Sequence, residues 1–360
     1  MAQRPKNIIE DIASDYLNIV LALRFDICTC QICKNQMLAY ILSKLPAKYV
    51  TSEAETLRTI IEQTKVEHQG EIARLIIEAV KLVTDNPPHA ARENKDENFK
   101  LLLDKIYQDR GLDFRHYRQE LLKRRIALRI RANRLSLYSE YLRLLINKPE
   151  EYDQLFDVLT INVTEFFRDP VIWDSVKIIC ENLIERKRER QNHTIRVWSA
   201  GCASGAEAHS IAILFKELLK QDEKFSLKII GTDIDRRSLE IARAGVYTKE
   251  ALKNVSPEYL QTYLKPMGRN HLVTQEIKDS VVFKHSDLIN SAHLENMDIV
   301  FCRNVFIYFS RSLQEMLVMK FYKALQKGGY LVMGKVETIL GEAKQIFEEI
   351  DHDAKIYQKK

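Results

Sequence analysis

A strand pattern that runs into a glycine-containing turn and then a helix constrains this chain most. Apolar residues 195–199 lead to the turn Gly201–Gly205, and a helical pattern follows from Ala206 to Leu219. A second strand pattern, 227–232, ends at Asp233. In α/β folds the amides that open such a helix bind anionic groups, and an acid at the next strand end accepts ribose hydroxyls. The two segments predict a nucleoside site and leave the cofactor open.

The same alternation of apolar strands and amphipathic helices continues towards the end of the chain. It predicts an α/β fold with a doubly wound parallel sheet covered on both faces. Residues 346–350 and 355–357 predict a final pair of antiparallel strands joined by a turn. A hairpin that closes a parallel sheet is typical of the class I methyltransferase variant of this fold. The further elements expected are strands at 281–285, 298–302 and 330–333 and helices at 237–244 and 312–325.

Length and composition indicate several domains in one cytoplasmic protein. The chain has 360 residues, of which 46% are hydrophobic and 29% charged, and its net charge of +5 is too small to predict a nucleic-acid partner. No apolar run approaches the roughly 18 residues of a membrane span, so no membrane insertion is expected. Acids in the first residues argue against a signal peptide.

Helical spacing and polar segments predict the domain boundaries. Apolar residues recur at helical spacing from residue 7 to about 84, and the polar segment that contains Pro87 and Pro88 predicts a linker. Three or four helices are expected from Phe99 to Leu159, and the helix at 114–134 is strongly basic. We expect an all-α N-terminal domain at 1–86, a linker at 87–98, a helical subdomain at 99–160 and an α/β domain at 161–360.

Two further segments place polar side chains near the predicted nucleoside site. Arg303, Asn304 and Tyr308 follow the strand at 298–302, and ligands of open α/β sheets bind at the carboxyl ends of strands. The segment 162–170, NVTEFFRDP, holds side chains that can bind polar cofactor atoms and one fixed positive charge. Taken alone, the tyrosine suits core packing and the second segment suits a capped linker helix.

Four segments in order resemble the CheR family of chemotaxis receptor methyltransferases. They are NVTEFFRDP, VWSAGCASGAEAHSIA, GTDIDRRSLEIARAGVY and FCRNVFIYF, and the resemblance covers about residues 99–360. It implies methyl transfer from S-adenosylmethionine, with S-adenosylhomocysteine as product, to glutamate γ-carboxylates on a cytoplasmic helix of a methyl-accepting chemoreceptor. A carboxylate is already ionised at pH 7, so such an enzyme needs positioning rather than a general base.

The resemblance also implies roles for individual residues. Arg168 and Tyr308 would orient the acceptor carboxylate. The chain departs from the family at 206–209, AEAH, where paired acids, Pro and Tyr are common, and at 334–337, GKVE, where the family has Gly-His-Ser-Glu. The residues expected to bind the cofactor are Asn162, Thr164, Arg168, Gly201, Glu207, Asp233, Asp287, Leu288, Arg303 and Asn304.

The resemblance also implies binding partners for the basic helix and for an inserted segment. An acidic receptor helix would dock on a basic face that carries Arg118, Arg124, Arg125, Arg129 and Arg131, although plain solvation of these side chains is the alternative. Residues 257–283 resemble a small β insertion that binds a receptor's C-terminal peptide in some relatives, but the turn at 266–270 matches poorly.

Three other functions compete with this interpretation. A signalling adaptor would bind cofactor and receptor without efficient turnover. A nucleic-acid methyltransferase would carry an Asn/Asp-Pro-Pro-aromatic segment after its fourth strand, which this chain lacks. An NAD-dependent dehydrogenase would use the Gly201 turn and Asp233 equally well.

Cys28, Cys30 and Cys33, followed by LPAKYV at 45–50, resemble the ComFB (late competence development) family over residues 5–85. This resemblance implies a helical, often dimeric module associated with zinc and with cyclic dinucleotides. Three thiolates at this spacing can bind zinc, with His68 as a candidate fourth ligand, and reduced structural cysteines are the alternative. Candidate nucleotide contacts, equally suited to an ordinary surface, are Arg24, Lys34, Lys48 and Tyr49.

Overall fold

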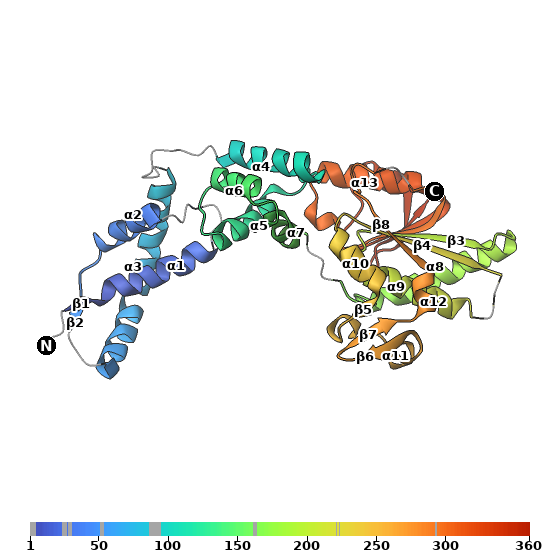
Figure 1. Ribbon diagram of the computed structural model, residues 1–360, viewed down its shortest axis with the longest axis horizontal. Coiled ribbons are helices and arrows are strands. Elements are labelled where there is room, and N and C mark those ends of the chain that lie inside the picture. The colour runs from blue at the N-terminus through green and yellow to red at the C-terminus, as the bar shows by residue number, and fades with distance from the viewer. Residues whose placement is uncertain are drawn as a thin grey trace. The chain divides into compact units, whose positions relative to one another are not determined.

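The computed structural model describes residues 5–23, 27, 31–50, 54–85, 95–160, 164–220, 222, 224–291 and 294–360. The chain divides into two compact units (Figure 1). The first contains Met1–Ile106 and Gln119–Leu159, and the second contains Tyr107–Arg118 and Thr160–Lys360. Among the described helices, none is long and apolar enough to cross a membrane.

Three helices form the core of the N-terminal region: α1 (Ile8–Leu23), α2 (Gln31–Leu42) and α3 (Ala54–Asp85). Ile12, Met37 and Ile76 belong to the apolar cluster between them. The prediction of an entirely helical domain was wrong in one detail, because β1 (Lys6–Asn7) pairs with β2 (Tyr49–Val50) in antiparallel fashion. The Asn7 side-chain oxygen joins the two segments by accepting from the Lys48 and Ile9 amides at 3.1 and 3.3 Å.

Four helices follow: α4 (Lys95–Arg110), α5 (Gln119–Ala132), α6 (Tyr138–Asn147) and α7 (Glu151–Leu159). The helix predicted from Phe114 begins at Gln119, because the preceding residues pair with the second unit's own loop. Tyr117 forms an isolated antiparallel bridge with Phe309, and the Arg118 amide donates to the Tyr308 carbonyl at 2.9 Å. Within the predicted linker, residues 95–98 belong to α4, and residues 87–94 lie outside the described residues.

The predicted basic face is smaller than expected, because several of its arginines bind the protein itself. Arg129 donates two hydrogen bonds of 2.9 Å to Glu151, whose side chain is 3% exposed. Arg125 donates to the carbonyls of Val158 and Leu159 at the end of α7. Arg118 lies before the helix and donates to the Phe309 carbonyl at 3.2 Å.

The second unit is built on one seven-stranded sheet in the order β11-β12-β10-β9-β3-β4-β8. The five strands from β10 to β8 are parallel, and β12 is antiparallel to both β10 and β11. This arrangement confirms the predicted doubly wound sheet with a terminal hairpin. The strands are β3 (Thr194–Ala200), β4 (Ser226–Asp233), β8 (Val281–His285), β9 (Met297–Cys302), β10 (Leu325–Met333), β11 (Phe347–Asp351) and β12 (Ile356–Lys359).

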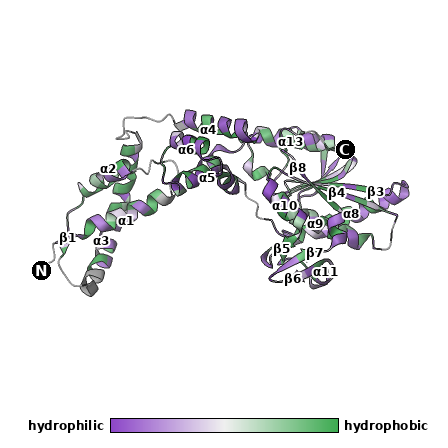
Figure 2. Ribbon diagram, viewed as in Figure 1, coloured by the Kyte–Doolittle hydropathy of each residue, from purple (hydrophilic) through white to green (hydrophobic). Residues whose placement is uncertain are grey.

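Both faces of the sheet are buried, which is why its central strands are apolar throughout. In β9, Ile299 and Phe301 join one apolar cluster and Val300 and Cys302 join the other. The first cluster includes residues of α8 (Pro170–Glu189), α9 (Ala206–Leu218) and α10 (Arg236–Ala244), and the second includes residues of α13 (Arg311–Ala324). Apolar and polar residues alternate along these helices (Figure 2).

The β insertion is a three-stranded antiparallel sheet in the order β5-β7-β6. It contains β5 (Val246–Tyr247), α11 (Pro257–Tyr263), β6 (Leu264–Met267), β7 (Asn270–Val273) and α12 (Gln275–Asp279). The end of the predicted segment, residues 281–283, belongs instead to strand β8 of the large sheet.

Candidate functional site

The predicted cofactor residues gather at the carboxyl ends of three neighbouring parallel strands. Gly201 follows β3, Asp233 ends β4, and Arg303 and Asn304 follow β9. Strand β3 pairs with both β4 and β9, so the three ends meet at one edge of the sheet. This edge is where open α/β sheets bind their ligands.

The Gly201 turn is held by packing and by hydrogen bonds to β4. The amides of Gly201 and Cys202 donate to the Thr232 carbonyl at 2.8 and 3.0 Å. Gly201 has φ of +76°, and a Cβ there would lie 2.6 Å from a methyl group of Val305. These contacts explain the glycine by backbone conformation and by its neighbour in the β9 loop.

Asp233 presents a buried carboxylate at the end of β4. Its two oxygens accept from the amides of Ala203 at 2.8 Å and Asp235 at 2.9 Å. Burial raises the pKa of Asp233 to about 6, while these amide donors oppose the shift. Each carboxylate oxygen has a second lone pair, so the group can still accept from ribose hydroxyls.

Arg303 lies between two acids, and its side chain is 2% exposed. One Nη donates to Asp169 and to the Arg168 carbonyl, both at 2.9 Å, and the other lies 3.5 Å from Glu207. The second oxygen of Glu207 accepts from the Ser199 hydroxyl at 2.7 Å. Burial raises the pKa of Glu207, and the positive charges of Arg303 and Arg168 oppose that shift. The site is therefore a buried, nearly balanced array of charges.

Two polar atoms of this array are buried and have no hydrogen-bond partner among the described residues: Arg303 Nε and Asn304 Oδ1. An unpaired buried donor or acceptor costs about 1–3 kcal/mol. Asn304 also has a left-handed backbone conformation, with φ of 59°. A donor and an acceptor on adjacent residues, at the same sheet edge as the Asp233 carboxylate, fit a polar nucleoside cofactor.

Glu337 holds the loop that carries Asn304, and the sequence motifs did not predict this role. Its carboxylate accepts from the amides of Asn304 at 2.9 Å, Phe306 at 2.7 Å and Gly334 at 2.7 Å. Burial raises the pKa of Glu337, and these donors oppose the shift. The sequence feature that could have indicated this role is an acid in the loop that follows the apolar strand β10.

Other predicted site residues lie in two segments, one ahead of α8 and one after β9. Thr164 and Arg168 are partly buried ahead of α8, and the Arg168 carbonyl also accepts from the Trp173 indole at 3.0 Å. Tyr308 ends a short 3-10 helix, η2 (Phe306–Tyr308), after β9. Asn162 lies outside the described residues.

The loop after β8 contains the residues expected near the adenine. The Asp287 carboxylate accepts from the Ile289 amide at 2.8 Å, so it stabilises its own turn. The Leu288 carbonyl accepts from Lys320 at 2.7 Å, which ties the loop to α13. Tyr117 was not predicted here, but burial raises its pKa and the charges of Asp287 and Asp233 add to the shift.

At residues 206–209 the sequence differs from the usual family pattern, and packing explains the last of these residues, His209. His209 is fully buried, and its Nδ1 lies 2.9 Å from the Tyr247 hydroxyl, which donates to the Ser204 carbonyl. Burial lowers the pKa of His209 to about 3, so the ring is neutral and donates from Nδ1. Glu207 therefore faces Arg303 while His209 belongs to the core.

The zinc prediction finds no support. Cys33 is fully buried in α2, and Cys28 and Cys30 lie outside the described residues. His68 lies 3.6 Å from the Glu71 carboxylate. Within the described part of the chain, no three His, Cys, Asp or Glu side chains gather so that they could hold a metal ion.

The parallel sheet closed by an antiparallel terminal hairpin is the fold of class I S-adenosylmethionine-dependent methyltransferases. Residues 162–356 match the CheR methyltransferase SAM binding domain, and residues 97–160 match the CheR methyltransferase all-alpha domain. Residues 6–87 match the late competence development protein ComFB. The chain belongs to the CheR methyltransferase family.

Named relatives agree with this assignment. A chemotaxis protein methyltransferase of Borreliella burgdorferi is 32% identical over 69% of this chain and 89% of the relative. A probable chemotaxis protein methyltransferase of Rhizobium etli is 31% identical over 68% of this chain and 94% of the relative. An uncharacterized 104.1 kDa protein of Rhodobacter capsulatus is 31% identical over 64% of this chain, which spans 24% of that protein.

The comparison with solved structures is weaker. An S-adenosylmethionine dependent methyltransferase from Mesorhizobium loti is 18% identical over 39% of this chain and 46% of that chain, with a TM-score of 0.23. A likeness at this level carries no argument about this protein.

Proposed function

We propose that this protein transfers a methyl group from S-adenosylmethionine to glutamate side chains on the cytoplasmic helices of a chemoreceptor. The observation that carries the proposal is the buried array at the strand ends, in which Arg303 Nε and Asn304 Oδ1 have no partner among the described residues. The names of the Borreliella and Rhizobium relatives support a role in chemotaxis. A cytoplasmic location stays a prediction from the sequence.

The residues present fit the cofactor. When bound, S-adenosylmethionine supplies a methyl group on a positively charged sulfur. Asp233 is proposed to accept from the ribose hydroxyls, and Glu207 to bind the methionine or ribose end. Asp287 and Leu288 border the adenine in this proposal. Asn162, Thr164, Arg168, Gly201, Arg303 and Asn304 complete the proposed set.

Arg168 and Tyr308 are proposed to orient the acceptor carboxylate. The Arg168 guanidinium lies close enough to Glu207 to affect its pKa, so it adds positive charge to the site. A glutamate side chain is ionised at pH 7, so no group of the protein has to remove a proton. The protein then contributes rate by holding the carboxylate in line with the methyl group.

The test is to incubate the purified protein with radiolabelled S-adenosylmethionine and receptor cytoplasmic fragments. We expect base-labile methyl esters on the fragment. Binding of S-adenosylhomocysteine without ester formation would contradict the proposal and favour the adaptor function. Tyr308→Phe should lower methyl transfer while calorimetry shows unchanged S-adenosylhomocysteine affinity; unchanged transfer would mean that Tyr308 only packs.

We also propose that the N-terminal domain regulates this activity, with a cyclic dinucleotide as candidate ligand and a dimer as candidate assembly. Tyr49 is 66% exposed, whereas Lys48 contacts Thr64 at 2.9 Å and Glu67 at 3.3 Å. Arg24 lies outside the described residues. Titrating the methylation rate against cyclic dinucleotides tests the regulation, and metal analysis of the purified protein tests for zinc.

A further inference from the structure

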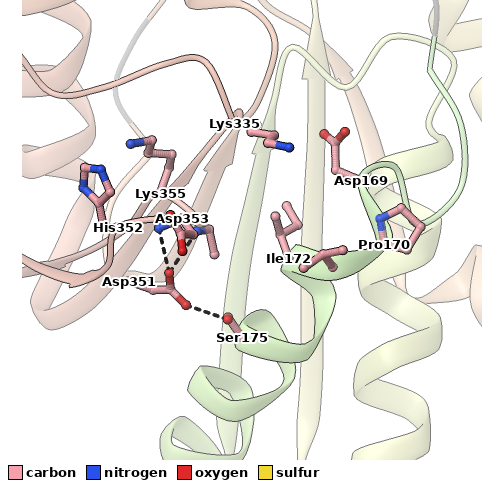
Figure 3. A pocket seen from close by; sticks show the side chains of 11 residues that line it. Asp169, Pro170, Ile172, Ser175, Lys335, Asp351, His352, Asp353 and Lys355 are labelled. Atoms are coloured by element: carbon pink, nitrogen blue, oxygen red, sulfur yellow. Dashed lines mark hydrogen bonds between the residues drawn. The ribbon is translucent and has the colours of Figure 1, made fainter.

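A cavity beside the candidate site is so far without a role. It has a volume of about 760 Å³ and lies between the start of α8, the loop after β10 and the turn that joins β11 to β12 (Figure 3). Its walls are formed by residues 169–172, Ser175, Lys335 and residues 351–355.

The cavity adjoins the site on the side away from Asp233. Asp169 in its wall accepts from Arg303 at 2.9 Å, and Arg303 reaches Glu207. In the sheet, β10 and β12 lie on one side of β9, and β3 and β4 lie on the other. With the nucleoside at the ends of β3 and β4, the side of β10 and β12 is left for a second substrate. The cavity is on that side.

Two cations in the cavity wall have no acidic partner among the described residues. Lys335 is exposed just after β10, and Lys355 is partly exposed in the turn between β11 and β12. Lys355 has a left-handed conformation with φ of 54°. A lysine costs about 1 kcal/mol more than glycine in that conformation. The turn therefore keeps a long cationic side chain where a glycine would fit at less cost.

The acids of the cavity are mostly engaged. Asp169 pairs with Arg303. Asp351 accepts from the Ser175 hydroxyl at 2.6 Å and from the amides of residues 353 and 354 at 2.9 Å (Figure 3), and these donors hold its pKa below the usual value. Asp353 is exposed at the rim. Lys335 and Lys355 are thus the charges best placed to meet an incoming group of opposite sign.

Apolar surface lies beside these cations. Val171, in the cavity wall, is 84% exposed, and Val336, next to Lys335 in the chain, is 76% exposed. Isolated valines are common on protein surfaces, but here Val171 shares the cavity wall with both lysines and Val336 follows Lys335 in the chain. A peptide with acidic and apolar side chains complements this combination.

We propose that the cavity binds the acidic segment that flanks the accepting glutamate on the acceptor protein. Lys335 and Lys355 contact its carboxylates, and Val171 contacts an apolar side chain. This inference rests on the proposed function, because it assigns the part of the acceptor that lies beside the methylated residue. Charges at such a rim act mainly on encounter and binding, so they affect KM more than kcat.

The test measures methylation of a chemoreceptor cytoplasmic fragment by four proteins: wild type, Lys335→Glu, Lys355→Asn and the control Lys327→Glu. Lys327 is exposed in β10 near the opposite end of the strand. At low ionic strength Lys335→Glu should raise KM about tenfold with a much smaller change in kcat. Lys355→Asn suits the left-handed turn, so it should raise KM without lowering Tm. Lys327→Glu should leave KM unchanged.

A charge exchange completes the test. A fragment whose acidic residues beside the acceptor are replaced by lysine should be a poor substrate for wild type and a better one for Lys335→Glu. Equal KM values in all four proteins, or no response to the altered fragment, would overturn the inference while wild-type methylation upholds the proposed function. If wild type forms no methyl ester at all, the proposed function fails and the inference fails with it.

Discussion

The pH dependence of cofactor binding should report the ionisation of Asp233. Burial raises its pKa to about 6, compared with 3.8 for an ordinary aspartate. The ribose hydroxyls are proposed to donate to the carboxylate, and a protonated carboxyl group accepts less well. With a pKa of about 6, roughly nine tenths of the groups are ionised at pH 7 and about one tenth at pH 5. The affinity should fall about tenfold over that interval, which is about 1.4 kcal/mol.

Calorimetric titration with S-adenosylhomocysteine from pH 8 to pH 5 measures this change. Asp233→Asn should remove the pH step and weaken binding at pH 7 by about 3 kcal/mol, because two charge-assisted hydrogen bonds of about 1.5 kcal/mol each are lost. Glu207→Gln is the matched control, since it removes the other buried acid of the site and should keep the step.

Protonation of Asp233 at low pH does not unfold the protein, so unfolding caused by this group cannot account for the loss of affinity. Its pKa is higher in the folded protein than in the unfolded chain, so ionisation costs stability as pH rises from 3.8 towards 6. Protonation of Asp233 therefore favours the fold at pH 5. A wild-type affinity that stays constant from pH 7 to pH 5, in protein shown to be folded by circular dichroism, would refute the assigned role or the burial of its charge.

Two further substitutions test buried contacts of the second unit, one beside the site and one at the opposite end of β9. Glu337→Gln leaves at least one of the amides of Asn304 and Phe306 facing an NH2 group, so it should lower the free energy of unfolding by about 2 kcal/mol in urea titration and weaken S-adenosylhomocysteine binding. Lys187→Met removes the cation that lies 2.7 Å from the fully buried Asp298 carboxylate. It should lower the free energy of unfolding by about 3–5 kcal/mol, because it leaves a buried charge unpaired. Adding Asp298→Asn to the same chain should restore most of this loss. Unchanged stability in either single variant would contradict these contacts.

Much of the α/β fold could be predicted because its strands and helices carry clear periodic patterns. Strand β8 spans the predicted residues, and β9 begins one residue before the prediction. The helix expected from Phe114 was misplaced because its apolar and basic residues have helical spacing, while Tyr117 pairs with Phe309 far along the chain. Local periodicity does not reveal such a long-range contact.

The sequence alone determined that Asp233, Arg303 and Asn304 follow strands of a parallel sheet, and hence that they meet at one edge. Only the tertiary structure decided what surrounds them. It assigned Arg129 of the basic helix to Glu151, brought Glu337 to two amides of the loop after β9, and opened a cavity beside Asp169. The physical reason is that strand direction follows from local pattern, whereas the partner of a charge depends on which distant segments pack against it.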